Sequence, residues 1–137
     1  MRLSDDGLKV LILREGKSNK AYLDTKGIPT IGVGHTGGVK MGDVISDEEV
    51  ENLLRKDCIL CENTVNTYVK VLLTQAQFDA LVSFIFNVGV NAFKKSTLLK
   101  VLNLGNYTEA AKQFDRWHIP PEIVGRRTSE KLQFLQA

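Results

Sequence analysis

The chain has 137 residues, of which 43% are hydrophobic and 25% charged, with 11 glycines and 3 prolines. This length and composition indicate one globular domain and exclude a disordered tail, a collagen-like fibre and a disulfide-based scaffold. The net charge of +2, from 18 basic and 16 acidic residues, is too balanced to indicate a nucleic-acid partner. It is compatible with an anionic polymer, although the positive bias is weak.

No segment of the sequence predicts a membrane span or an export signal. The longest strongly apolar stretch, residues 80–93, contains two asparagines and a glycine and is shorter than the about 20 residues that a span needs. It therefore predicts a buried core helix. Residues 1–6 include two acids and no apolar run, so we expect no secretory signal peptide and folding in a cytoplasm.

The two cysteines, Cys58 and Cys61, have the C-x-x-C spacing that occurs in redox and zinc motifs. A zinc site needs about four ligands, and the sequence offers no second pair at metal-binding spacing. The cysteines also lie inside a helical pattern instead of following a strand and a turn. We therefore expect two buried core thiols and no metal or cofactor.

The first third of the chain predicts a helix followed by a small sheet. Ser4 is a candidate N-cap, and the apolar spacing of the first helix ends near Glu15. Residues 21–35 contain two short β-prone runs around the turn sequence 24–27, which predicts an antiparallel hairpin or a three-stranded sheet. Pro29 is suited to the start of an edge strand.

The remaining sequence predicts helices. Two capping boxes, in which a hydroxyl residue precedes Glu or Gln by three positions, open the two main ones: Ser46-x-x-Glu49 and Thr74-x-x-Gln77. The first is expected to run to about residue 69 and the second to end at Gly89. Shorter helices are expected at 96–103, 107–117 and about 122–135.

These elements predict an α+β fold with a small antiparallel sheet lobe and a larger helical lobe. The expected sheet lobe covers about residues 15–45, the helical lobe covers about 1–14 and 70–137, and a long connecting helix covers about 46–69. Two lobes imply a cleft between them, and clefts are where substrates bind.

Two carboxylates and a hydroxyl, Glu15, Asp24 and Thr30, fall within the predicted sheet region. A hairpin folded over the end of the first helix could bring them together. One carboxylic acid that protonates a leaving oxygen and a second carboxylate that activates water are what glycosidic bond cleavage needs. On the spacing alone, solvated charges and a turn aspartate are the favoured interpretation.

Longer runs of residues resemble one known family. The runs are 14–16, 21–24 and 27–36 around the three candidates, followed by 74–81, 86–89, 96–98, 114–117 and 126–130. In these runs the chain resembles the phage-type lysozymes, glycoside hydrolase family 24, and most of all the endolysins of lambdoid-type phages or prophages. The resemblance covers nearly the whole chain and implies a lysozyme-like fold.

The resemblance also implies roles for individual residues. Glu15 would be the general acid, while Asp24 and Thr30 would hold the attacking water. By the same resemblance, four residues would bind the sugar: Thr36, Phe86, Asn87 and Ser96. The arginine that pairs with the acid would be Arg126, with Arg127 as the alternative register.

The implied function is an endolysin muramidase that hydrolyses β-1,4 bonds between N-acetylmuramic acid and N-acetylglucosamine in peptidoglycan, for host cell lysis. We expect a cofactor-free monomer, made in the host cytoplasm, that reaches the wall through a holin-type membrane lesion, without nucleic acid or stable membrane insertion. The alternative is a peptidoglycan-binding or scaffold module of lysozyme fold with little or no hydrolysis. The presence of Glu15, Asp24 and Thr30 together argues against that alternative.

Three further features are expected to be structural. A lone histidine at the end of an apolar strand, His35, is expected to be a hydrogen-bonded structural residue. Trp117 is expected to belong to the core, with sugar stacking as the alternative. The basic residues of the last 45 positions are expected to form a solvated face, with a surface for anionic cell-wall polymer as the alternative.

Overall fold

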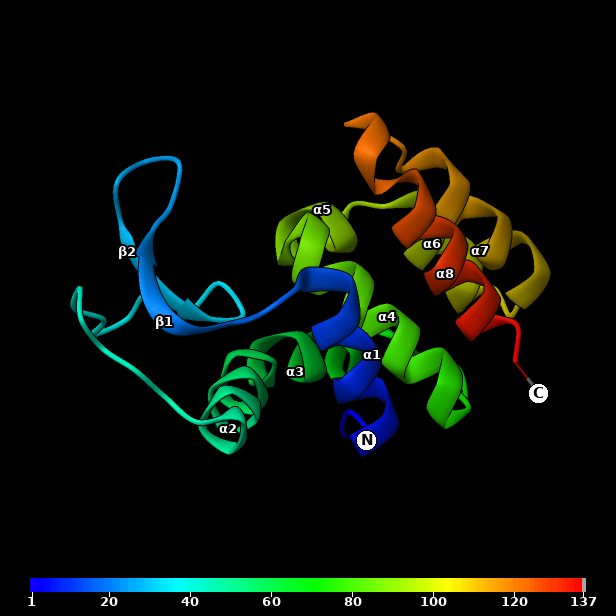
Figure 1. The fold of residues 1–137 in the computed structure, drawn as a ribbon. Coiled ribbons are helices and arrows are strands. Elements are labelled where there is room, and N and C mark those ends of the chain that lie inside the picture. The colour runs from blue at the N-terminus through cyan, green and yellow to red at the C-terminus, as the bar shows by residue number, and fades with distance from the viewer. Residues whose placement is uncertain (137) are drawn as a thin grey trace. The chain divides into compact units, whose positions relative to one another are not determined.

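The computed structural model describes residues 1–136, which form two compact units. The sheet unit consists of residues 8–59, and the helical unit consists of residues 1–7 together with the described chain from residue 60 onward. Figure 1 gives the order of the elements along the chain. The boundaries fall inside two helices, α1 (Asp5–Glu15) and α3 (Ile59–Tyr68).

Helix α1 begins and ends at the residues that the sequence indicates. The backbone N–H of Gly7 donates to the Ser4 hydroxyl over 2.9 Å, which is the predicted N-cap. After Glu15 the chain leaves the helix at Gly16, whose φ of 78° is a left-handed conformation that glycine adopts without strain. Glu15 is therefore the last residue of a helix that ends abruptly.

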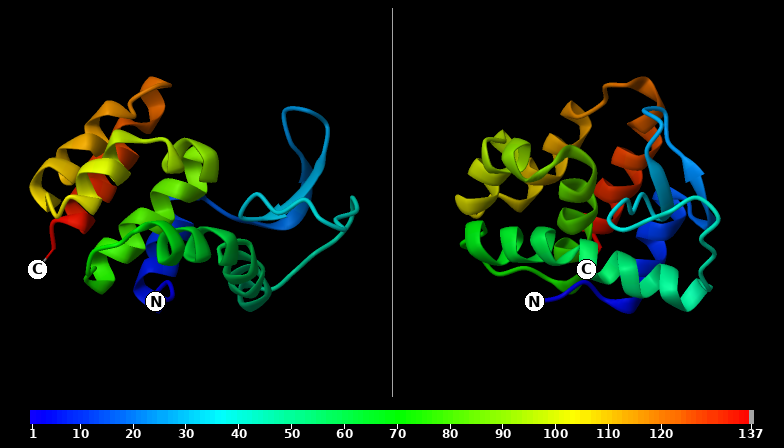
Figure 2. Two further views of the ribbon diagram at one scale, coloured as in Figure 1. Left: turned by 180° about the vertical axis from the view of Figure 1, so that it is seen from behind. Right: turned by 90° about the vertical axis from the view of Figure 1, so that its left-hand side faces the viewer.

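The sheet is a two-stranded antiparallel hairpin, as Figure 2 shows. Strand β1 (Ser18–Leu23) pairs with β2 (Pro29–Gly32), and Tyr22 lies opposite Thr30. The hairpin and the strand start at Pro29 are confirmed. Within residues 1–136 no third strand forms: the chain after β2 contributes two isolated bridges, one between Lys20 and Val44 and one between Ile31 and His35.

The predicted long helix over residues 46–69 is two helices. Helix α2 (Asp47–Asp57) opens with the expected capping box of Ser46 and Glu49. It ends at Cys58, and α3 follows directly. Cys58 keeps right-handed helical backbone angles, with φ of −82° and ψ of −11°. Neither glycine nor proline lies within residues 54–62 to mark the break in the sequence.

The helical unit is built on α4 (Gln75–Val88), which opens with the Thr74–Gln77 capping box and ends at Gly89, where φ is 94°. Its residues 78–85 are all buried, which is typical of a helix covered on every side. The other elements of this unit are α5 (Val90–Lys94), α6 (Thr97–Asn103), α7 (Tyr107–Gln113), the 3-10 turns η1 (Phe114–Arg116) and η2 (Pro121–Ile123), and α8 (Val124–Phe134). The short α5 was not predicted, whereas the helices corresponding to α6, α7 and α8 were.

Aromatic rings form the centre of the helical unit. Phe84 of α4 makes edge-to-face contacts with Phe114 and Trp117, each with ring centroids 5.3 Å apart, and with Phe93 at 6.4 Å. Such arrangements match the positive edge of one ring to the negative face of another. Trp117 packs against this cluster through Phe84 but is itself half-buried, so the expected place in the core is met only in part.

Both cysteines are free and buried, as the sequence predicts. No group of three potential metal ligands occurs within residues 1–136. Over the same residues, no helix has the length and apolarity needed to cross a lipid bilayer.

Burial raises the pKa of the Cys61 thiol to about 11, with a smaller contribution from the neighbouring charge of Glu62. The folded state thus disfavours the thiolate, so its stability is complete below pH 9 and falls as pH rises from about 9 toward 11. Replacing Cys61 by Ala removes this penalty. We expect the stability of the wild type relative to Cys61→Ala to fall by about 2 kcal/mol between pH 8 and pH 11.

Urea unfolding at several pH values measures this difference. The exposed neighbour Asn63 supplies the control, because an Asn63→Ala variant should differ from the wild type by the same amount at every pH. A pH-independent difference for Cys61→Ala would contradict the assignment.

Candidate active site

A hollow in the sheet unit lies against the end of α1. Its volume is about 330 Å³ and its wall includes Glu15, Tyr22, Gly32 and Gly34. Glu15 is exposed, so its carboxyl is accessible to a molecule in the hollow. The two glycines carry no side chains, which leaves part of the wall as bare backbone.

Asp24 closes the hairpin turn with its own side chain. Its Oδ1 accepts hydrogen bonds from the backbone N–H groups of Lys26 and Ile28, both over 2.8 Å. The backbone N–H of Asp24 also donates to the Ile28 carbonyl over 3.0 Å. One carboxylate oxygen therefore holds the turn, and the half-buried residue retains Oδ2 as a second acceptor.

Thr30 is 3% exposed, and its hydroxyl donates to the Ile28 carbonyl over 2.8 Å. A hydroxyl has one hydrogen, so the remaining capacity of this oxygen is to accept. Tyr22 pairs with Thr30, so Asp24 follows β1 two residues after the position opposite Thr30. Asp24 and Thr30 thus each retain an oxygen acceptor near the turn end of the hairpin.

His35 connects the chain after β2 to the end of α2. Its Nδ1 lies 2.8 Å from Oδ2 of Asp57, and its Nε2 lies 3.0 Å from the carbonyl oxygen of Gly37. The expectation of a hydrogen-bonded structural histidine is confirmed. The adjacent Thr36 is exposed, so the position that the resemblance assigns to sugar binding lies on a surface loop that His35 anchors.

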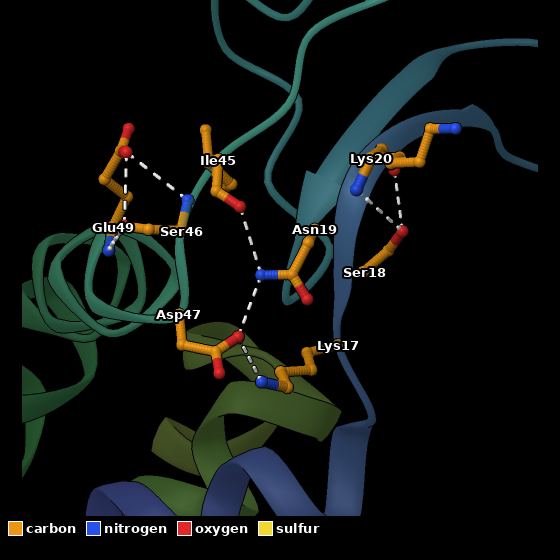
Figure 3. Close-up of polar contacts among 8 residues, drawn as sticks. All are labelled: Lys17, Ser18, Asn19, Lys20, Ile45, Ser46, Asp47 and Glu49. Atoms are coloured by element: carbon orange, nitrogen blue, oxygen red, sulfur yellow. Dashed lines mark hydrogen bonds and ion pairs between the residues drawn. The ribbon is translucent and has the colours of Figure 1, made fainter.

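A polar cluster joins β1 to the start of α2, as Figure 3 shows. Asp47 accepts from Lys17 over 2.5 Å and from Asn19 over 2.9 Å, and Asn19 also donates to the Ile45 carbonyl over 3.1 Å. The hydrogen bond from Lys17, followed by that from Asn19, lowers the pKa of Asp47. The cluster fixes the chain just after Glu15, because Lys17 is two residues further on.

The site candidates of the helical unit occupy helix ends. Phe86 and Asn87 are in the last turn of α4, half-buried and exposed respectively. Ser96 is buried, and its hydroxyl donates to the Phe93 carbonyl over 2.7 Å and accepts from the N–H of Leu99 over 3.1 Å. Ser96 is thus the N-cap of α6, and its assignment to sugar binding stays a prediction.

A buried charge network surrounds Glu130 of α8, which has no exposed surface. Its Oε2 accepts from the Ser83 hydroxyl over 2.5 Å and from Nε of Arg126 over 3.1 Å, while its Oε1 accepts from Arg127. Arg126 also donates to the Ser83 carbonyl over 2.9 Å. The network ties α8 to α4 and holds both arginines of the sequence pair in place.

The two arginines have different surroundings. The Arg127 side chain is buried, donates to Oδ1 of Asn87 and lies over the Phe84 ring, with its Cζ 5.1 Å from the centroid. Arg126 is half-buried. The contact between Arg127 and Asn87 was not predicted. The spacing of the arginines three and four residues before Glu130 indicates their shared partner, but nothing in the sequence links them to Asn87.

Comparison with known proteins identifies the family. The family model for phage lysozyme matches residues 13–130. The chain belongs to the phage lysozyme family. It is 43% identical to the endolysin of Salmonella phage P22, over 98% of this chain and 99% of the relative. It is 41% identical to the endolysin of Acyrthosiphon pisum secondary endosymbiont phage 1 over the full length of both. The predicted lysozyme is confirmed.

Solved structures confirm the lysozyme-like α+β fold. A crystal structure of a P22 lysozyme mutant superposes with a TM-score of 0.95 at 42% identity, covering 99% of both chains. The muramidase domain of SpmX from Asticaccaulis excentricus gives a TM-score of 0.92 at 37% identity, again over 99% of both chains.

The Glu130 network generates a prediction for stability. Replacing Glu130 by Gln removes the negative charge between two guanidinium groups and leaves them uncompensated in a buried site. Breaking a buried ion pair in this way costs about 3–5 kcal/mol. We expect Glu130→Gln to lower the free energy of unfolding by about that amount, measured by urea denaturation.

Glu122, an exposed residue of η2, provides the matched control. Glu122→Gln should change stability by less than about 0.5 kcal/mol, as surface substitutions usually do. Equal stability of the two variants would show that the Glu130 charge is not needed.

Proposed function

We propose that this lysozyme cleaves the β-1,4 bond between N-acetylmuramic acid and N-acetylglucosamine with inversion at the anomeric carbon. Glu15 is the general acid, and Asp24 and Thr30 hold the attacking water. The observation that carries the proposal is the hydrogen bond from the Thr30 hydroxyl to the Ile28 carbonyl. It commits the only hydroxyl hydrogen, so that Thr30 can hold water as an acceptor.

The acid step uses the exposed carboxyl at the end of α1. Glu15 gives its proton to the glycosidic oxygen as the bond from that oxygen to the anomeric carbon breaks, which lets the sugar leave as a neutral alcohol. The hollow beside Glu15, lined by backbone at Gly32 and Gly34, supports this role because it lets a sugar ring approach closely.

The water step uses the two acceptors on the hairpin. A water that donates one hydrogen to Thr30 Oγ1 and the other to the Asp24 carboxylate directs a lone pair away from both residues. That lone pair attacks the anomeric carbon, and Asp24 takes the proton that the water loses. Because this water needs room, we expect the carboxyls of Glu15 and Asp24 to be about 6.5–9.5 Å apart, the separation found in inverting enzymes.

The helical unit supplies the proposed sugar contacts. The Asn87 amide oxygen accepts from Arg127, so the amide nitrogen is left to donate to a sugar oxygen. Phe86 offers an apolar ring surface beside it, and Thr36 of the sheet unit offers a hydroxyl. Arg126 keeps the role that the family resemblance implies, as the proposed partner of the general acid. Its bonds to Glu130 and to the Ser83 carbonyl hold the side chain within the helical unit.

The proposed biological role is host lysis through hydrolysis of wall glycan strands by a monomer. Relatives named endolysins support it. Synthesis in the host cytoplasm and passage to the wall through a holin-type lesion complete the proposal. No nucleic acid or cofactor takes part.

A wall-binding module with little hydrolysis is the competing function. Turbidity of chloroform-treated Gram-negative cells separates the two, because a hydrolase clears the suspension and a binding module does not. Sedimentation of the protein with the same cells, without clearing, would support the module.

Glu15→Gln tests the acid. Glutamine keeps the shape of the side chain but has no proton to donate, so lysis should fall by at least about a hundredfold. The fold should be unchanged because Glu15 is exposed. Glu48→Gln, which alters another exposed carboxyl of the sheet unit, should lyse like the wild type. Lysis by Glu15→Gln at the wild-type rate would remove Glu15 from this role.

Thr30→Val and Thr30→Ser test the water. Valine keeps the volume of threonine but cannot accept a hydrogen bond, so turnover should fall by at least about a hundredfold while binding of sugar fragments persists. Serine retains the hydroxyl and should restore much of the activity. Early-time NMR of the wild-type products should show the α-anomer. Initial formation of the β-anomer, or a glycosyl ester trapped on Asp24, would contradict inversion.

A further inference from the structure

Exposed acids are missing from a long part of the helical unit. Between Asn63 and Thr108 the sequence has one acidic residue, Asp79. Asp79 is 4% exposed, and it accepts hydrogen bonds from Ser4 and from Gln75. The same stretch contains four lysines, so the surface that it forms carries positive charge without compensation.

Three of these lysines are related to the chain that follows α3 or to the helix α6 that holds it. The side chain of Asn103 in α6 accepts from the backbone N–H of Lys70 over 2.7 Å and donates to the Tyr68 carbonyl over 2.9 Å. Nζ of Lys94 lies 4.8 Å from the centroid of the Tyr68 ring. Lys100 is three residues before Asn103, on the same face of α6. Within residues 1–136 none of these lysines forms an ion pair.

Two leucines close in sequence to the bond between Lys70 and Asn103 are exposed to solvent. Leu72, in the loop after α3, is 90% exposed, and Leu104, at the end of α6, is 80% exposed. Leu104 follows Lys100 by four residues and so shares its face of the helix. The loop is pinned at the Leu72 carbonyl, which accepts from the Tyr107 hydroxyl over 2.6 Å, and at Lys70 by Asn103.

We propose that this loop face, made of Tyr68, Lys70, Leu72, Lys94, Lys100 and Leu104, docks on an anionic lipid surface. Leucines held out in water by a hydrogen-bonded loop gain free energy when they enter the boundary of a bilayer. Lysines around them are attracted to anionic headgroups. A tyrosine is suited to the same depth, since its ring is apolar and its hydroxyl is polar.

The chemistry favours lipid over an anionic polymer. A polar polymer could neutralise the lysines, but it would leave Leu72 and Leu104 in water. The docking is peripheral, because it uses side chains at the surface of the unit. Its consequence is to concentrate the enzyme next to a membrane that lies beside its wall substrate, independently of catalysis in the sheet unit.

Sedimentation with vesicles tests the proposal on the full chain. The protein should pellet with vesicles of equal parts phosphatidylglycerol and phosphatidylcholine at low salt, and remain in solution with phosphatidylcholine alone. Added sodium chloride should weaken the binding, because it screens the lysines. Failure to pellet with the anionic vesicles at low salt would overturn the proposal.

Two double variants separate the lysine and leucine contributions. Lys70→Gln with Lys100→Gln should weaken binding by about twenty-five-fold, which is about fivefold for each charge near an anionic surface. Leu72→Gln with Leu104→Gln should weaken it by about tenfold, since the inserted apolar surface is lost. Wild-type binding by the leucine variant would identify a purely electrostatic site, as would full displacement of the wild type by soluble polyglutamate, and either result would overturn the lipid assignment.

Matched variants elsewhere control for charge and hydrophobicity. Lys56→Gln changes an exposed lysine of the sheet unit, and Leu132→Gln changes a leucine of α8 that is 62% exposed. Both should bind vesicles like the wild type. Hydrolysis of purified, lipid-free sacculi should be retained by all variants, which distinguishes loss of docking from loss of the fold or of the proposed hydrolytic activity.

Discussion

The hairpin of the sheet unit depends on the Asp24 carboxylate, which accepts two backbone hydrogen bonds within the turn. One oxygen accepts from two backbone N–H groups of the turn, and this bonding brings Ile28 and then Thr30 back along β1. The carbonyl of the same Ile28 receives the Thr30 hydroxyl hydrogen. A five-residue turn therefore determines where the second carboxylate oxygen lies and which way the hydroxyl is oriented. The residue proposed for the water step is thus also the residue that closes the turn.

The helical unit contains a buried positive charge, which is shielded from water and paired with a buried carboxylate. Arg127 is almost fully buried and Glu130 is fully buried, so the desolvation of each charge is offset by the other and by the hydroxyl of Ser83. The same arginine orients the Asn87 amide. A network that replaced these groups by apolar residues could be equally stable, but it would leave the amide at the end of α4 without a fixed orientation. Orientation of polar groups is thus a reason for burying ions here.

Local interactions explain what could be predicted from the sequence. The starts of α2 and α4 follow from capping boxes, whose two residues are three positions apart. The hairpin follows from a turn in which the N–H groups that donate to Asp24 belong to residues at most four positions away. Strand β1 begins at Ser18, earlier than its β-prone residues indicate. The later chain supports this start, because the Ala21 N–H donates to the Asp43 carbonyl and the Ile45 N–H donates to the Asn19 carbonyl. The partner of Asn87 lies 40 residues away on α8, and no local pattern encodes it. A contact of this kind depends on a distant segment and is therefore missed by a reading of local patterns.

Acidic residues are distributed unevenly among the starts of the helices. Acids near the starts of helices, such as Asp47 and Glu49, complement the helix dipole and remain exposed. In the stretch from Asn63 to Thr108, α4 and α6 are capped by the hydroxyls of Thr74 and Ser96 and have no acids in their first turns. These two helices are thus capped without adding negative charge to the surface. A positive apolar face can therefore exist on a chain that is nearly neutral.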